Sequence, residues 1–95
     1  MPLFRKRPII VEAFQWFPSK LAVTSDWWQL ALDTPHDQIG SVTEHGTFGG
    51  DQAHLLIFTL EGVHRANAGD WIIRGVYGEI YPCKPEIFSF TYEPI

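Results

Sequence analysis

Apolar and polar residues alternate along several short stretches of this chain, and a period of two is typical of β-strands. Residues 8–17 are rich in β-branched and aromatic side chains, and they predict a half-buried strand that ends at Pro18. Residues 54–60 form a nearly continuous apolar run, which predicts a strand in the middle of a sheet. Residues 63–68 and 71–74 follow as two further strands. The spacing indicates a sheet built from hairpins.

Glycines mark the expected turns. Glu61-Gly62 predicts a tight hairpin turn, because glycine accepts the positive φ that such turns require. Residues 75–78 predict a type I turn closed by Gly78 in the left-handed conformation, which joins 71–74 to a strand over 79–81. This register would place Arg74 near Glu79 across the ladder, so we expect an ion pair between them.

The pattern changes from strand to helix once. Thr24 or Ser25 is a suitable N-cap, and Asp26 would lie near the positive end of the helix dipole. An apolar segment follows and ends before Pro35, which predicts a helix of two to three turns. A helix of this length does not persist alone in water, so it must pack against the sheet.

The remaining segments complete the predicted fold. Residues 37–53 are rich in Gly and polar side chains and predict a mobile loop, with a short strand over 39–43. Residues 86–88 predict a single helical turn, and 89–92 predict a final strand. We therefore expect one α+β domain over residues 1–95: a small, mainly antiparallel β-sheet that curls toward a barrel, with one short helix.

Composition and charge narrow the classes of partner. The single cysteine, Cys83, cannot form an intramolecular disulfide, which fits a reducing cytoplasm. No apolar run approaches the roughly 20 residues that span a bilayer. The net charge is −4, and no Lys or Arg occurs from Leu21 to His64. A nucleic-acid surface needs several basic residues on one face. We expect neither nucleic acid nor membrane as a partner.

Four histidines, His36, His45, His54 and His64, lie nine or ten positions apart. Metal sites are usually marked by close pairs of His or Cys, so we expect no metal and no cofactor. Asp70 follows Gly69 in a predicted turn, where an aspartate caps backbone N–H groups two residues on. An enzyme would have to use Asp70, His64 or Cys83. No nucleophile with a base and an orienting group is evident around them, and we assign no catalytic residue.

Aromatic side chains carry the candidate binding site. They make up 15% of the chain, more than a small interior has room to bury. Trp27 and Trp28 are adjacent, so a helix directs them about 100° apart, one inward and one outward. Surplus rings beside cations suit a site that stacks a planar base and neutralises a phosphate. They equally suit a protein–protein interface. The candidate ligand-binding residues are Trp16, Trp28, Arg65, Asp70, Trp71, Arg74, Tyr77, Glu79, Tyr81 and Lys84.

Both ends of the chain carry recognisable motifs. They are Phe4-Arg5-Lys6-Arg7-Pro8-Ile9-Ile10-Val11-Glu12-Ala13-Phe14-Gln15-Trp16, Thr59-Leu60-Glu61-Gly62, Gly69-Asp70-Trp71-Ile72-Ile73-Arg74-Gly75-Val76-Tyr77-Gly78-Glu79-Ile80-Tyr81-Pro82-Cys83-Lys84-Pro85-Glu86-Ile87-Phe88 and Thr91-Tyr92-Glu93-Pro94. In these segments the chain resembles a widespread group of small bacteriophage and prophage proteins; residues 18–53 lie outside the resemblance. It implies a phage origin and the cytoplasm of an infected bacterium, and it supplies no catalytic residues.

Three hypotheses follow. The first is a non-enzymatic phage accessory protein that counters host defence by sequestering a nucleotide-derived signal, with the site shared between subunits of a homo-oligomer. The rings listed above would stack the base, Arg65, Arg74 or Lys84 would hold phosphate, and Asp70 or Glu79 would accept ribose hydroxyls. The second is a protein–protein inhibitor or adaptor that uses the acidic middle of the chain and Trp27 to bind a host defence protein or a phage protein. The third is a small hydrolase.

Overall fold

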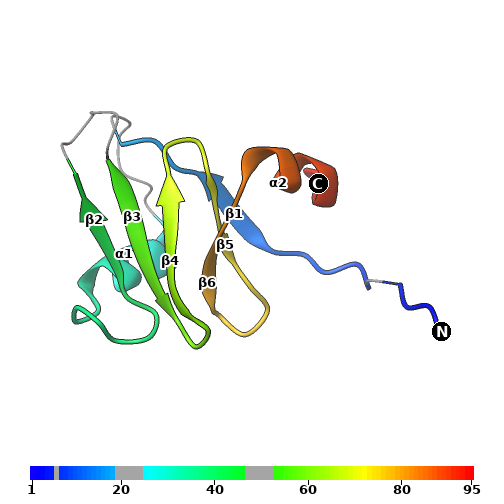
Figure 1. Ribbon diagram of the computed structural model, residues 1–95, viewed down its shortest axis with the longest axis horizontal. Helices are drawn as coiled ribbons and strands as arrows, with labels where there is room; N and C mark the ends of the chain where they lie inside the picture. Colours follow the sequence, from blue (N-terminus) through cyan, green and yellow to red (C-terminus); the bar gives the residue numbers. More distant parts are fainter. Residues whose placement is uncertain (6, 19–24, 47–52) are drawn as a thin grey trace.

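The computed structural model describes residues 1–5, 7–18, 25–46 and 53–95 of the protein (Figure 1). Six strands and two helices occur in these ranges. In chain order they are β1 (Glu12–Gln15), α1 (Asp26–Asp33), β2 (Val42–His45), β3 (His54–Thr59), β4 (Gly62–Asn67), β5 (Trp71–Arg74), β6 (Ile80–Cys83) and α2 (Pro85–Thr91). None of the helices in the described ranges is long and apolar enough to cross a membrane.

The strands form two three-stranded antiparallel sheets. One has the order β1-β5-β6 and the other the order β2-β3-β4. Strand β6 lies against β3 and β4, where the two sheets meet. They do not close into a barrel. The predicted α+β class with mainly antiparallel strands is therefore confirmed, whereas the expected barrel-like curl of a single sheet and the single helix are wrong.

The core lies where both sheets and α1 converge. Leu55 and Ile57 of β3 face it together with Ile72 of β5, and all three are fully buried. Helix α1 contributes Trp28 and Ala31. The cluster of buried apolar side chains comprises Trp16, Trp28, Ala31, Val42, Ala53, Leu55, Ile57, Ala66, Ile72 and Ile80.

Helix α1 agrees with its sequence prediction. Ser25 occupies the N-cap in an extended conformation, and its carbonyl oxygen accepts hydrogen bonds from the backbone N–H groups of Trp28 and Gln29. The helix ends at Asp33, two residues before Pro35. Thr24, the other candidate N-cap, lies outside the described residues.

Two predicted strand ranges differ from the structure. The strand expected over 8–17 is confined to Glu12–Gln15, because these four residues are the ones that pair with β5. The predicted loop over 37–53 contains β2 at Val42–His45, slightly later than the strand expected over 39–43. Residues 47–52 of that loop lie outside the described part of the chain.

Both hairpin glycines adopt positive φ as predicted, +113° at Gly62 and +81° at Gly78. The register of the β5–β6 hairpin, however, differs by one residue from the prediction. The Gly75 N–H donates to the Glu79 carbonyl oxygen at 2.8 Å, so Arg74 lies opposite Ile80 rather than beside Glu79. The expected partner of Arg74 is thus wrong: its guanidinium lies 3.7 Å from the Glu12 carboxylate on the neighbouring strand β1.

The C-terminal segment holds a second helix where a strand was expected. Residues 89–92 lie in or directly after α2, which begins with Pro85 at its first position. Proline is pre-organised for this position because its fixed φ suits a helix and its missing N–H needs no partner there. The helix also brings Phe88 against Trp71, a long-range contact that the local pattern does not reveal.

Candidate functional site

An open groove runs beside the β5–β6 hairpin and helix α2. It has a volume of about 1700 Å³ and is lined mostly by apolar side chains. Its walls come from four parts of the chain: residues 7–13 up to and within β1, Ile39 and Gly40 before β2, the β3–β4 hairpin, and the segment from β5 to the C-terminal residues. Segments distant in sequence therefore meet at one surface.

A row of aromatic side chains forms one wall of this groove. The rings of Trp71 and Phe88 stack in parallel, with centroids 4.0 Å apart and planes 5° apart. Phe88 in turn stacks on Tyr92 at 5.0 Å. The Tyr92 and Tyr81 hydroxyls lie 3.4 Å apart. We call Trp71, Phe88, Tyr92 and Tyr81 the aromatic row.

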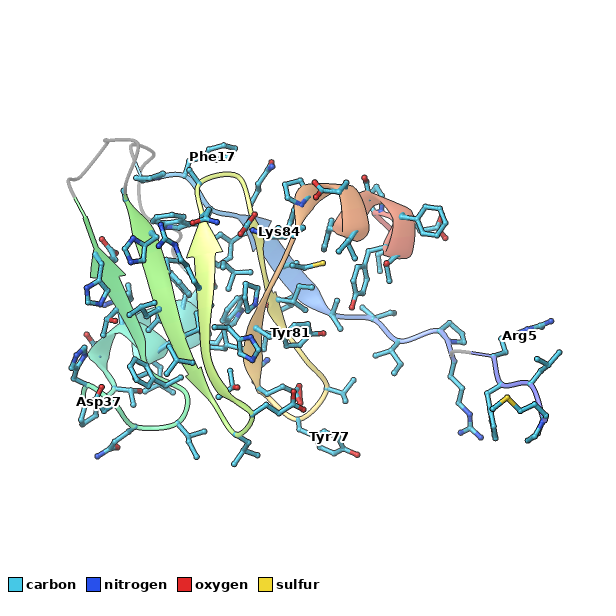
Figure 2. The ribbon with its side chains drawn as sticks, viewed as in Figure 1. Arg5, Phe17, Asp37, Tyr77, Tyr81 and Lys84 are labelled. Atoms are coloured by element: carbon cyan, nitrogen blue, oxygen red, sulfur yellow. The ribbon has the colours of Figure 1, made fainter. Side chains whose placement is uncertain are left out.

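The environment of Tyr81 changes its acidity. Burial of the phenol raises the pKa of Tyr81 well above its usual value, and the hydrogen bond with Tyr92 and the nearby Glu79 carboxylate act in the same direction. Tyr81 is therefore a neutral hydrogen-bonding group over the physiological range. Tyr77, by contrast, projects from the β5–β6 turn and is 91% exposed (Figure 2).

The charges around the groove are mainly acidic. Glu61, Glu79 and Glu93 all line it. Arg7 is the one Lys or Arg among the described lining residues, and His64 is the one histidine. The surface thus combines an aromatic wall with a negative rim.

Four of the ten candidate residues meet at this groove: Trp71, Tyr77, Glu79 and Tyr81. The Glu79 carboxylate bends back over its own turn and accepts a hydrogen bond from the Tyr77 N–H at 3.2 Å. The other six lie elsewhere. Trp16 and Trp28 are core residues, with 9% and 3% of their surface exposed.

The three cations expected to hold phosphate are not gathered at the rings. Arg74 pairs with Glu12, as described above. Arg65 donates through Nε to the Asn67 side-chain oxygen at 2.9 Å, on the face of β4 that alternates away from buried Ala66. The Lys84 ammonium lies 3.2 Å from the Asp70 carboxylate.

Asp70 has a structural role close to the predicted one. Its side chain is 5% exposed, and its Oδ2 accepts hydrogen bonds from Lys84 Nζ and from the backbone N–H of Asn67. The capped N–H lies three residues earlier in the chain, rather than two residues later. With Oδ2 held by these two donors, Asp70 stabilises the β4–β5 turn.

The remaining chemical candidates are dispersed. Cys83 is half-buried on β6, opposite Trp71. His64 lies on the groove, whereas His45 and His54 form a cross-strand pair with stacked rings 5.5 Å apart. The His36 ring lies 6.5 Å from that of His45. No group of three or more His, Cys, Asp or Glu side chains in the described ranges is placed to hold a metal ion.

Trp27, the surface tryptophan of the second hypothesis, is half-buried. Its ring lies 5.7 Å from Phe14, and its indole N–H donates to Glu12 at 3.0 Å. Trp28 is the buried member of the pair, a choice that the helical spacing alone does not make. The sequence reasoning missed Phe88 and Tyr92. Their spacing of four positions after Pro85 is the signal for one face of a helix.

No protein-family profile, curated protein or solved structure matches this chain.

Proposed function

We propose that this protein is a non-enzymatic protein-interaction module whose groove binds an extended polypeptide segment of apolar and basic character. The observation that carries the proposal is the groove itself: a mostly apolar channel with an aromatic wall and an acidic rim. Aromatic side chains provide large contact areas at low entropic cost, and they are enriched in protein interfaces.

The size of the groove supports a polypeptide more than a small molecule. Pockets for small ligands usually have volumes of about 300–1,000 Å³ and enclose most of the ligand. The groove has about 1700 Å³ and is partly open to solvent. An extended segment can occupy such a channel and place alternate side chains on its wall.

The electrostatics support the same choice. A phosphate-bearing ligand requires charge-assisted donors, and Arg is the usual one. Arg65, Arg74 and Lys84 are each engaged with another side chain outside the groove. The three glutamates of the lining favour a cationic partner instead.

The phage resemblance of the chain ends gives this module a biological setting. On that resemblance the partner is a host defence protein or a phage protein, and the interaction takes place in the cytoplasm of an infected bacterium. The groove replaces the acidic middle and Trp27 as the contact surface, because Trp27 is occupied by Phe14 and Glu12.

Capture of a nucleotide-derived signal is the second candidate. It is favoured by one specific observation: Trp71 and Tyr81 line the same groove as Arg7, so a base and a phosphate could be engaged together. In this case the function is sequestration of a small molecule to counter host defence.

A binding panel distinguishes the two functions. Isothermal titration would compare an apolar basic decapeptide, its acidic counterpart with Glu in place of each Arg and Lys, cyclic nucleotides and cyclic ADP-ribose isomers. We expect the basic peptide alone to bind. Binding of a nucleotide instead would select the second candidate, and failure of every ligand to bind a protein whose groove is open would overturn both.

A charge-reversed variant locates the binding. Glu61 and Glu93 are exposed on the groove, so Glu61→Lys with Glu93→Lys changes its charge at little cost in folding. We expect this pair to weaken peptide binding about tenfold. Glu44→Lys is the matched control, because Glu44 is exposed on β2 and lies outside the groove. Equal weakening by the control would contradict a site in the groove.

A further inference from the structure

The chain carries a segment with the properties that the groove favours. Residues 1–5, which we call the arm, extend away from both sheets (Figure 1), and Arg5 lies far along this extension (Figure 2). Leu3 and Phe4 of the arm are 96% and 92% exposed. Large apolar side chains displayed together on an extended segment mark an interaction site rather than ordinary surface.

From this we propose that the segment bound in the groove is the arm of a second copy of this chain, so that two copies exchange arms and form a homodimer. The inference rests on the proposed function, since it names the polypeptide that the groove binds. The exchange gives a dimer with two equivalent grooves, each of which holds the arm of the other copy.

Charge complementarity is the first argument for this occupant. The arm carries one cationic side chain, Arg5, and no acidic one. The groove of the second copy presents Glu61, Glu79 and Glu93. Opposite charges at a partly desolvated interface fix register and suppress other partners.

Continuity with the groove is the second argument. Residues 7–11, which follow the arm, already line the groove of their own copy. The arm therefore leaves the body at the edge of the surface that would receive its counterpart. In a two-fold symmetric pair the same patch serves both copies, so one rotation delivers each arm to the other groove.

The dimensions and exposure agree with exchange. Five extended residues span about 17 Å, a large part of the 26 Å width of the molecule. Pro2 restricts the backbone of the arm and reduces the entropy lost on docking. The same association would cover three exposed side chains that line the groove. They are Ile10 (78% exposed), Tyr77 (91%) and Ile95 (98%).

Light scattering and sedimentation of the full chain over a concentration series test the proposal. We expect the wild type to form a dimer and Phe4→Asp to weaken association at least tenfold. Phe90→Asp is the matched control, because Phe90 is 94% exposed on α2 and does not line the groove. A dimer that survives Phe4→Asp would use another face and would overturn the exchange.

A mixing experiment makes the test specific. Phe4→Asp retains its groove, whereas the Glu61→Lys, Glu93→Lys variant retains its arm. Each variant alone should be monomeric, and an equal mixture should form heterodimers through the one intact arm and groove. Absence of heterodimers in the mixture would contradict arm docking.

The arm as a separate peptide distinguishes this proposal from the function on which it rests. A peptide of residues 1–10 should bind the Phe4→Asp protein and should not bind the groove variant. If the wild type is monomeric while the panel peptide still binds, the exchange is wrong and the proposed function stands. If neither peptide binds, both proposals are wrong.

Discussion

The Lys84 ammonium lies 3.2 Å from the Asp70 carboxylate, and the two differ sharply in exposure: 49% of the lysine side chain is exposed against 5% of the aspartate. This pair joins the turn after β4 to Lys84, the residue that precedes α2 and is labelled in Figure 2. The same aspartate oxygen holds the Asn67 N–H. The pair therefore holds the start of α2, the helix that contributes Phe88 to the aromatic row.

Replacement of Asp70 should destabilise the fold more than replacement of Lys84. Asp70→Ala leaves the half-buried Asn67 N–H and the Lys84 ammonium without their partner, and we expect a loss of about 2–3 kcal/mol in the free energy of unfolding. Lys84→Met removes one donor to the Asp70 carboxylate, which still accepts the hydrogen bond from the Asn67 N–H. We therefore expect a loss of about 1–2 kcal/mol in the free energy of unfolding. Urea denaturation measures both.

The exposed pair of Arg74 and Glu12 is the control for this comparison. Its atoms are 3.7 Å apart, and both side chains are at least 43% exposed. Surface ion pairs contribute about 0–1 kcal/mol, so Arg74→Ala should change stability by about 0.5 kcal/mol. A cost of Asp70→Ala no larger than that of Arg74→Ala would contradict the structural role of Asp70.

Trp28 should be a stability determinant rather than a ligand contact. It is 3% exposed, and its ring meets Phe14 edge-on at 4.9 Å. Trp28→Ala creates a cavity and should cost about 3–5 kcal/mol, measured by urea denaturation. Leu30→Ala on the same helix should be nearly neutral, since Leu30 is 69% exposed. Similar losses for both variants would argue against the packing of α1.

Local signals predicted much of the fold because neighbouring residues determine those elements. Ser25 and Pro35 bound α1, and Gly62 and Gly78 fix the two hairpins. The strand expected at 89–92 was wrong for the opposite reason. Alternating aromatic and polar residues suit a strand there, but Pro85 and the stacking of Phe88 on Trp71 favour a helix. Tertiary contacts of this kind override β-propensity.

The candidate site was predictable in its residue types but not in its partners. Trp71 and Tyr81, two of the rings named from the sequence, line the groove. The cations found partners on distant segments, as Arg74 did with Glu12, and no local pattern encodes these pairs. His45 and His54 show the same limit. A spacing of nine gave no sign of contact, yet the β2–β3 register stacks their rings.

Alkaline titration should reveal the half-buried phenol of Tyr81. Its pKa is raised in the native state by burial and by Tyr92, so the folded protein retains this proton to higher pH than the unfolded chain does. The contribution to stability is complete below the unfolded value of about 10 and is lost as pH rises above it. Tyr81→Phe should therefore lose less stability than the wild type from about pH 9 to about pH 11.

Denaturation at each pH, together with phenolate absorbance, measures this difference. The absorbance titration of the wild type should contain one phenol that ionises later than the others, and Tyr81→Phe should lack it. Identical pH dependence in the two proteins would show that Tyr81 gains nothing from its surroundings.

Helix α2 should depend on the stacking of Phe88 with Trp71. A helix of seven residues is too short to persist by itself, so its stability must come from packing. Phe88 is held between Trp71 and Tyr92, with ring centroids at 4.0 Å and 5.0 Å. Phe88→Ala should cost about 2–3 kcal/mol and release the helix. Phe90→Ala should be nearly neutral, because Phe90 is 94% exposed.

Hydrogen exchange of the Phe88 and Tyr92 amides, which donate to the Lys84 and Phe88 carbonyl oxygens, reports on the helix directly. Faster exchange in Phe88→Ala alone, with an unchanged core, would establish the aromatic row as the anchor of α2, and equal protection in both variants would refute it.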